Sequence, residues 1–247
     1  MIKLTRNAAP DKLTDEFVKE GTEKYKRNKE SVWNVDWLKE ALLSLSNQKC
    51  AYCEGRLDLK SDYMEVEHFR DKKDYPEEVL IWENLLPSCK HCNGHKSSHD
   101  VVNEPIINPF IDVPNEHIYL KSYLYKHKDD LGRNTIDVLD LNDSTRLVIA
   151  RCKLGTEINK LLEERLDEIQ NGLTKTGAKK RFQNKMRELM KKCLPESEYS
   201  AVCSTELIHS VEYSNIVNIM KELDIWNEEF EQYNSTISSI AFDISGK

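Results

Sequence analysis

Two cysteine pairs with the same spacing constrain this fold more than any other feature: Cys50-Ala-Tyr-Cys53 and Cys89-Lys-His-Cys92. Two residues between thiols is the spacing that turns both sulfurs onto one tetrahedral Zn²⁺. The pairs are separated by 35 residues, more than in a simple zinc ribbon, so a segment must be inserted between the two knuckles. Coincidence or a redox motif is the alternative, but two such pairs around one insert favour a structural zinc site.

The other three cysteines lack paired spacing. Cys152, Cys193 and Cys203 lie in stretches of helical periodicity, and we expect them to be small buried residues. Seven cysteines is an odd number, and the N-terminal residues lack the apolar region of a secretory signal, so a disulfide framework is not expected. No apolar run approaches the ~20 residues that span a bilayer. We therefore expect a cytoplasmic protein without a membrane partner.

Hydrophobic periodicity divides the chain of 247 residues near residue 140. We expect an α+β, mainly α protein: residues 1–140 hold a zinc-stapled module with N-terminal helices, and residues 141–247 hold a helical module. Strands are predicted at 63–69 and 118–125, a turn at 131–135, and a short helix from Asn93. The predicted longer helices span 13–29, 35–45, 144–170, 178–193, 197–221 and 224–234.

The charges are distributed unevenly although the formal net charge is only -7. Residues 144–193 carry 13 Lys or Arg against 6 Asp or Glu, and residues 196–247 carry 2 against 10. The basic segment at 175–192, which includes Lys179, Lys180 and Arg181, can neutralise phosphates; a solvated helix face is the alternative. The acidic segment can pack on the basic one or face a protein partner. Residues 49–100 carry 8 basic against 11 acidic residues, so we expect phosphate attraction to come from elsewhere.

The insert between the knuckles contains Glu67-His68, and Asn93 follows the second knuckle. A carboxylate and an amide oxygen are hard ligands that suit Mg²⁺, and a histidine with a pKa near ~6.5 can serve as a base. A zinc staple would hold a strand end and a helix start together, and this ββα layout suits one-metal phosphodiester hydrolysis. Taken singly, each residue is more often structural. Glu67 and His68 also point to opposite faces of an ideal strand, so both can serve one site only if the strand ends or bulges there.

A second histidine pattern lies in the same region. His91 and His95 are four residues apart, which places both on one helix face as in metal-ligand pairs. His91 lies inside the knuckle, which makes a ligand role less expected for it than for His95. We expect His99 and His117 to be surface residues.

Together these residues resemble the HNH branch of the His-Me finger nucleases. The shared pattern is Cys-x-x-Cys, acidic-His, Asn-Leu and Cys-x-x-Cys-Asn-x-x-Lys, and it covers residues 49–98 here. The resemblance implies that His68 activates water, that Glu67 and Asn93 hold a catalytic Mg²⁺ or Mn²⁺, and that Asn84 braces the loop. It also implies that Lys96 contacts phosphate and that the four knuckle cysteines hold structural Zn²⁺. Arg70, just after the base, can contact the phosphate backbone.

A narrower resemblance spans residues 1–150 and includes Gln48–Glu54, Glu65–Phe69, Trp82–Leu86 and Ile107–Pro109. These segments are similar to the PtuB-like nuclease subunits of Septu and retron-associated anti-phage systems. That resemblance implies an ABC/SMC-type ATPase partner like PtuA, and a retron reverse transcriptase with its DNA–RNA product as a further partner. DNA is the expected substrate. Structured RNA such as tRNA, and a non-catalytic zinc-knuckle interaction module, are the alternatives.

Overall fold

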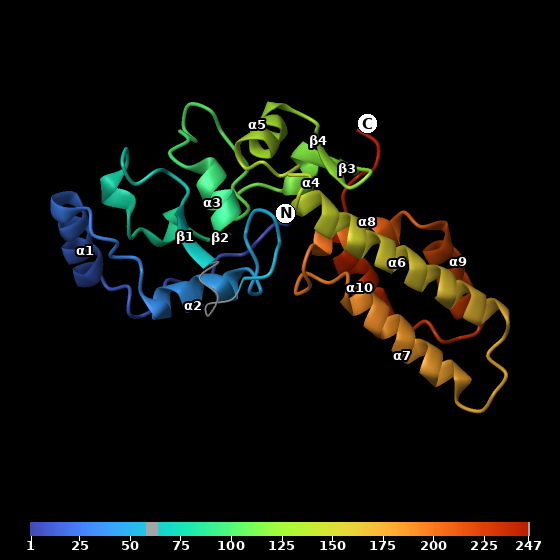
Figure 1. Ribbon diagram of the computed structural model, residues 1–247. Coiled ribbons are helices and arrows are strands. Elements are labelled where there is room, and N and C mark those ends of the chain that lie inside the picture. Colours follow the sequence, from blue (N-terminus) through green and yellow to red (C-terminus); the bar gives the residue numbers. More distant parts are fainter. Residues whose placement is uncertain (58–63, 247) are drawn as a thin grey trace. The chain divides into compact units, whose positions relative to one another are not determined.

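The computed structural model describes residues 1–57 and 64–246, and within them the chain divides into two compact units (Figure 1). The first unit comprises Met1–His117 and His127–Leu141, and the second comprises Ile118–Lys126 and Asn142 to the end of the described chain. The protein is mainly helical with two small sheets, as the sequence predicts. In the described ranges, no helix is both long and apolar enough to traverse a bilayer.

Two helices precede the first knuckle. α1 (Asp15–Asn28) begins after Thr14, whose hydroxyl accepts a hydrogen bond from the backbone N–H of Phe17 at 3.1 Å. α2 (Asp36–Leu45) buries four leucines against the first unit's core: Leu38, Leu42, Leu43 and Leu45. Both helices fall within the predicted ranges.

α1 also supports the loop that follows the first strand. This loop contains the 3₁₀ turn η2 (Pro76–Glu78). At Gly21 an added Cβ would lie 2.3 Å from Leu80 Cδ1, so only glycine permits this close approach of α1 to the loop. Lys26 Nζ lies 3.0 Å from a Glu77 carboxylate oxygen.

The centre of the first unit is a hairpin followed by a helix. β1 (Met64–His68) pairs antiparallel with β2 (Leu85–Cys89), with Met64 opposite Cys89 and His68 opposite Leu85. This confirms the strand predicted at 63–69, except that Tyr63 lies outside the described residues. β2 is preceded by the 3₁₀ turn η3 (Trp82–Asn84) and continues directly into α3 (Lys90–Lys96).

α3 begins three residues earlier than predicted. The sulfur of Cys89 accepts the backbone N–H of Cys92 at 3.5 Å and so caps the helix. A helix start at Asn93 was therefore wrong, because the knuckle itself supplies the N-terminal cap.

Beyond α3 the first unit is largely irregular, as the three prolines of residues 103–117 predict. It contains α4 (Pro114–His117) and α5 (Asp130–Val138). The turn predicted at 131–135 is wrong, because this segment lies inside α5. The carboxylate of Asp129 accepts the N–H of Gly132 at 2.8 Å and starts the helix.

The strand predicted at 118–125 is instead a hairpin, β3 (Ile118–Lys121) with β4 (Leu124–His127). Ser122 and Tyr123 both have positive φ, 52° and 63°, which is the backbone of a tight two-residue turn. Most of this hairpin groups with the second unit, because Leu120 N–H donates to the Asp243 carbonyl at 2.9 Å. The units therefore differ from the predicted domains 1–140 and 141–247 at residues 118–126 and at Leu141.

Five helices form the second unit. They are α6 (Leu147–Gln170), α7 (Ala178–Lys191), α8 (Ser200–Ile208), α9 (Val211–Glu222) and α10 (Glu228–Ile240). The single helix predicted over 197–221 is wrong, because the hydroxyl of Ser210 accepts the N–H of Tyr213 at 3.1 Å and caps a new helix, α9. All five helices contribute to one buried apolar cluster that includes Ile158, Phe182, Leu207, Ile216 and Phe230.

Candidate active site

The two knuckles bring four thiols together. The sulfur atoms of Cys50, Cys53, Cys89 and Cys92 all lie within 4.8 Å of one another, and all four residues are buried. The sulfurs of Cys53 and Cys89 are 3.8 Å apart. Zn–S bonds of about 2.3 Å in a tetrahedron place neighbouring sulfurs about 3.8 Å apart. The cluster therefore fits a structural zinc ion, as the cysteine spacing predicts.

Backbone N–H groups support the sulfurs as metal ligands. Cys89 N–H donates to Cys50 Sγ at 3.3 Å, and Cys92 N–H donates to Cys89 Sγ at 3.5 Å. Hydrogen bonds among the four thiols lower the pKa of Cys89 and raise the pKa of Cys53 and Cys92, so Cys89 is the thiol that loses its proton first. A lowered pKa favours the thiolate, which is the form that binds a metal.

The remaining cysteines do not join this cluster. Cys193 and Cys203 are buried, as predicted, and Cys193 packs with the apolar residues of the second unit. The prediction was wrong for Cys152, which is exposed, because it lies on the solvent side of α6.

Glu67 forms a buried ion pair with α3. Its side chain is 2% exposed, and one carboxylate oxygen lies 2.7 Å from Lys96 Nζ and 3.4 Å from the Tyr52 hydroxyl. Burial raises the pKa of Glu67 to about 7, although the Lys96 ammonium acts in the opposite direction. Around neutral pH this carboxyl group is therefore close to the point at which it gains or loses a proton.

His68 is the next residue of β1 and is also buried, with 3% exposure. Its Nε2 lies 3.1 Å from the carbonyl oxygen of Val79. Because a carbonyl can only accept, Nε2 carries the proton and Nδ1 carries the lone pair. Burial lowers the pKa of His68 to about 4, so the ring is neutral at pH 7. Within the described residues Nδ1 is buried without a hydrogen-bond partner.

Trp33 covers one side of this imidazole. The two ring centroids are 4.5 Å apart in an edge-on arrangement, and Lys72 Nζ lies 5.5 Å from the centroid of the Trp33 ring. Trp33 belongs to the connection between α1 and α2. Nothing in the sequence pattern links that connection to the histidine, so sequence reasoning missed Trp33.

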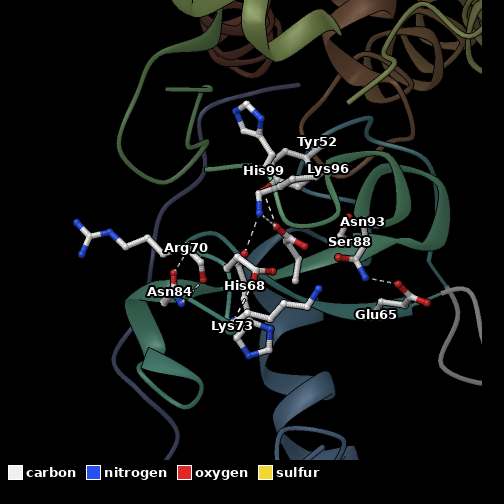
Figure 2. Close-up of polar contacts among 12 residues, drawn as sticks. Tyr52, Glu65, His68, Arg70, Lys73, Asn84, Ser88, Asn93, Lys96 and His99 are labelled. Carbon is white, nitrogen blue, oxygen red and sulfur yellow. Dashed lines mark hydrogen bonds and ion pairs between the residues drawn. The ribbon is translucent and has the colours of Figure 1, made fainter. Parts of the chain in front are cut away.

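Asn84 joins the two ends of the loop between the strands. Its side-chain oxygen accepts the backbone N–H of Arg70 at 2.7 Å, and its amide nitrogen donates to the Arg70 carbonyl at 3.1 Å and to the Glu78 carbonyl at 3.3 Å. Figure 2 shows Asn84 directed at the Arg70 backbone. Arg70 itself is half exposed and pairs with Glu78 at 2.9 Å.

Asn93 contacts a residue that the sequence analysis did not single out. Its side-chain amide donates a hydrogen bond to Glu65. Glu65 precedes Glu67 by two residues, so both project to the same face of β1. The two-residue period of the strand could have identified Glu65 once the strand was predicted.

The structure does not bring His68 and Asn93 to one side of the hairpin. In Figure 2 the His68 imidazole points away from Lys96 and from the Asn93–Glu65 pair. β1 ends at His68 but is regularly paired up to that residue without a bulge, so Glu67 and His68 still project to opposite faces of the hairpin. In this conformation the predicted convergence of base and ion ligands is not met.

The sequence predicts that Lys96 contacts a phosphate, but in the structure its side chain is buried against other residues. The residue is 1% exposed, and its ammonium donates to the His68 carbonyl at 2.9 Å in addition to pairing with Glu67. A buried ammonium with two acceptors is not available to a phosphate from this position. Lys96 instead connects α3 to both Glu67 and His68.

The basic segment of the second unit is partly neutralised. Lys185 lies 2.9 Å from Glu168 and Lys192 lies 3.0 Å from Glu157, both on α6. Arg187 forms two 2.7 Å hydrogen bonds with Glu229 of α10. The sequence analysis expects the acidic segment either to pack on the basic segment or to face a protein partner. The Arg187–Glu229 pair confirms that it packs on the basic segment.

The predicted nucleic-acid contacts lie at the start of α7 and are exposed: Lys179, Lys180 and Arg181. Lys179 donates to the Leu223 carbonyl at 2.9 Å and Arg181 donates to the Thr176 carbonyl at 3.1 Å. In the described part of the chain none of the three forms an ion pair with a carboxylate. Their positive charge thus belongs to the part of the basic segment that nearby carboxylates do not neutralise.

Comparison with known proteins gives the same assignment for the hairpin region. A family model described as HNH endonuclease matches residues 50–99. The chain is 43% identical over 236 residues to Septu protein PtuB of Bacillus thuringiensis, covering 94% of this chain and 91% of that protein. It is 30% identical over 154 residues to Septu protein PtuB of Bacillus mycoides (strain KBAB4), covering 49% of this chain and 52% of that protein. No solved structure matches the chain.

Proposed function

Because this chain belongs to the PtuB family of Septu proteins and is an HNH nuclease, we propose that it hydrolyses phosphodiester bonds of DNA with a divalent ion as cofactor. The observation that carries the proposal is the buried ion pair between Glu67 and Lys96, formed on the same strand that carries the neutral imidazole of His68. A carboxylate ligand for the ion, a general base and a positioning cation thus lie on one thiol-stapled hairpin and helix.

The ion ligands in this proposal are Glu67 and Asn93, and Glu65 joins them. Carboxylate and amide oxygens match Mg²⁺ or Mn²⁺ better than a soft transition metal. When bound, the ion stabilises the negative charge that develops on the phosphate and the leaving oxygen. Glu65 already contacts Asn93, which keeps the amide on the face of β1 where Glu67 lies.

His68 is the general base and removes a proton from the attacking water. Its Nε2 is held by the Val79 carbonyl, so the proton is accepted at Nδ1. Because Nδ1 is buried, water can reach it only after neighbouring side chains move. The described conformation is thus a resting state, in which Trp33 shields the base and Lys96 pairs with only one of the two Glu67 carboxylate oxygens.

Lys96 is a positioning residue in this proposal. Its ammonium lowers the pKa of Glu67 against the effect of burial, which keeps the carboxylate available to an ion. Asn84 is also a positioning residue, because its bonds to the Arg70 backbone fix the loop beside His68. Arg70, half exposed, can contact the phosphate backbone of the substrate.

Substrate attraction comes from the second unit. The exposed residues Lys179, Lys180 and Arg181 carry positive charge that nearby carboxylates do not neutralise, and such charge binds a phosphate backbone without regard to sequence. Structured RNA offers the same phosphates, so DNA and tRNA remain the two substrates to compare.

A resting state requires an activator. We assign this role to an ABC/SMC-type ATPase of the PtuA kind, with a retron reverse transcriptase and its DNA–RNA product as a further partner, and we place the complex in the cytoplasm. The PtuB relationship and the shielded base support this assignment. The structural Zn²⁺ in the four-thiol cluster keeps the hairpin and α3 together throughout.

The proposal is tested by nuclease assays on the chain alone and on the complex purified with its operon partners. Plasmid DNA and total RNA are incubated with Mg²⁺ or with EDTA. We expect Mg²⁺-dependent cleavage of DNA by the complex and much weaker cleavage by the isolated chain. Cleavage of RNA alone would move the substrate to RNA, and no cleavage of either would leave a zinc-knuckle interaction module as the function.

The matched variants are His68→Ala and His99→Ala. Loss of the general base is expected to reduce the cleavage rate by about 10²–10⁴-fold while the zinc content and circular dichroism stay unchanged. His99 lies after α3 and takes no part in the proposed chemistry, so His99→Ala should cleave normally. Unchanged cleavage by His68→Ala would contradict the assigned base.

A further inference from the structure

A second group of metal-ligand side chains lies outside both the thiol cluster and the proposed nuclease site. The side chains of His91, His95 and Asp140 each offer one ligand atom, and these atoms lie within 4.8 Å of one another. His91 and His95 are on α3, one turn apart, with ring centroids 4.4 Å from each other. Asp140 follows α5, and its left-handed backbone, with φ of 45°, directs this turn.

Neither imidazole is hydrogen-bonded to the Asp140 carboxylate, although His91 Nε2 also lies 3.4 Å from the Asp140 backbone carbonyl, a contact that it exchanges for the ion when it binds one. His95 Nε2 lies 3.7 Å and His91 Nε2 lies 4.0 Å from the same Asp140 carboxylate oxygen. Both distances exceed the 2.7–3.2 Å of N–H···O hydrogen bonds. Three ligand atoms at about 2.05 Å from a tetrahedral ion lie about 3.3 Å apart. A small closing movement therefore brings all three atoms to one ion.

Access and ligand mobility also suit an ion site. The side chains of His95 and Asp140 are 47% and 43% exposed, whereas His91 is 13% exposed. The exposed pair gives an ion a path from solvent and can adjust, while His91 is held by the adjoining knuckle. This combination meets the entry-path requirement of a metal site.

We propose that His91, His95 and Asp140 form a second metal site for a borderline divalent transition ion of the Zn²⁺ and Co²⁺ class. Two imidazoles and one carboxylate favour these ions over Mg²⁺ or Ca²⁺, which prefer oxygen ligands only. Three protein ligands leave at least one coordination position to water. The bound ion joins α3 to the turn after α5.

The site is separate from the two discussed above. The thiol cluster uses Cys92 of the same helix and Cys89, which caps that helix, but its four ligands are complete without a histidine. Asn93 and Lys96 contact Glu65 and Glu67 of β1, whereas His91 and His95 contact Asp140. The proposal therefore stands whether or not the nuclease assignment is correct.

Titration calorimetry with Zn²⁺ on the full chain tests the site. The protein is purified with its tightly held zinc and dialysed to remove loosely bound ions, and Zn²⁺ is added in excess Mg²⁺ so that any Mg²⁺ site is occupied. We expect one further equivalent of Zn²⁺ to bind to the wild-type protein. His95→Ala and Asp140→Ala should each lose this equivalent and keep the zinc of the thiol cluster, measured by elemental analysis.

Two variants serve as controls. His99 lies 3.7 Å from Glu104 and belongs to no group of three ligands within the described residues, so His99→Ala removes a comparable pair and should retain the further equivalent. Asn93→Ala should retain it too, which separates this site from the nuclease ion. The proposal is overturned if the wild-type protein binds no further equivalent, if His95→Ala keeps it, or if Asn93→Ala loses it. Because His95 and Asp140 are largely exposed, we expect both variants to fold.

Discussion

The two units of this protein are stabilised by different interactions. In the described part of the first unit, four thiols and buried ion pairs that include Lys49–Glu54 at 3.2 Å and Glu67–Lys96 at 2.7 Å surround a hairpin of two five-residue strands. In the second unit, five helices bury a continuous apolar cluster, and the ion pairs are at the surface. A two-stranded hairpin is at best marginally stable alone, whereas a helical bundle with its own core does not need a metal.

The burial of charged groups in the first unit explains why the candidate site lies there and not among the surface ion pairs of the second unit. Charged groups in the first unit are held without water, so their pKa values shift: burial raises the pKa of Glu67 and lowers the pKa of His68. Such shifts are typical of functional sites. The ion pairs of α7 with α6 are solvent-exposed, and exposed pairs contribute little to stability. We therefore expect the first unit to respond to metal and pH and the second to respond mainly to changes in packing.

The largest effect is expected from removing a zinc ligand. Cys92→Ser should unfold the first unit, because structural zinc contributes on the order of 10 kcal/mol to the folding of small metal-bound modules. The helical unit should still melt as a separate transition by circular dichroism. Cys152→Ser, at an exposed cysteine, is the matched control and should keep both transitions. Loss of both transitions in Cys92→Ser would show that the second unit depends on the first.

The next effect tests the apolar core of the second unit. Phe230 is 0% exposed within the helical cluster, so Phe230→Ala should destabilise that unit by about 3–5 kcal/mol. Its melting temperature should fall while the zinc content of the first unit stays the same. Ile149→Ala, at a 58% exposed position of α6, should change little. Loss of zinc in Phe230→Ala would contradict the independence of the two units.

Most elements of the fold were predictable, because the helices have regular apolar periodicity and the knuckle spacing constrains the hairpin. The errors in where helices begin share one physical cause. Asp129, Ser210 and the Cys89 sulfur each cap a helix start, and these caps decide boundaries that periodicity leaves open. The β3–β4 hairpin was missed because its turn, Ser122-Tyr123, contains neither the glycine nor the asparagine that usually marks positive φ.

The candidate site was predictable in its residues but not in their arrangement. The cysteine spacing predicts the thiol cluster, and the hairpin places Glu67 next to α3, the helix that carries Asn93. Two features depend on contacts between segments far apart in sequence: the shielding of His68 by Trp33 and the burial of Lys96 against Glu67. A phosphate-binding lysine and a buried positioning lysine have the same sequence pattern, and only the packing distinguishes them.

The buried ion pair of the first unit gives the next prediction. In Lys96→Met the ammonium that lowers the pKa of Glu67 is lost, so that pKa should rise further above its value of about 7. At pH 7 the carboxyl group is then protonated and binds an ion poorly, and cleavage should fall about 10–100-fold. Cleavage should recover as the pH is raised, which a rate–pH profile measures. Lys90→Met, at an exposed lysine of α3, is the control, and identical profiles for all three proteins would exclude a positioning role for Lys96.

The smallest effect is expected at the corresponding pair of the second unit, Arg187 with Glu229. The guanidinium lowers the pKa of Glu229, so the pair stabilises the folded state above the carboxyl's ordinary pKa, and this stability is lost as the pH falls through the lowered value. Because the side chains are 25% and 38% exposed, solvent screens the pair, and Arg187→Ala should cost about 0.5–1 kcal/mol near pH 7. A double-mutant cycle with Glu229→Gln, measured by urea unfolding at low and high salt, isolates the pair. A coupling that is unaffected by salt would place this pair with the buried ones of the first unit and remove the distinction between the two units.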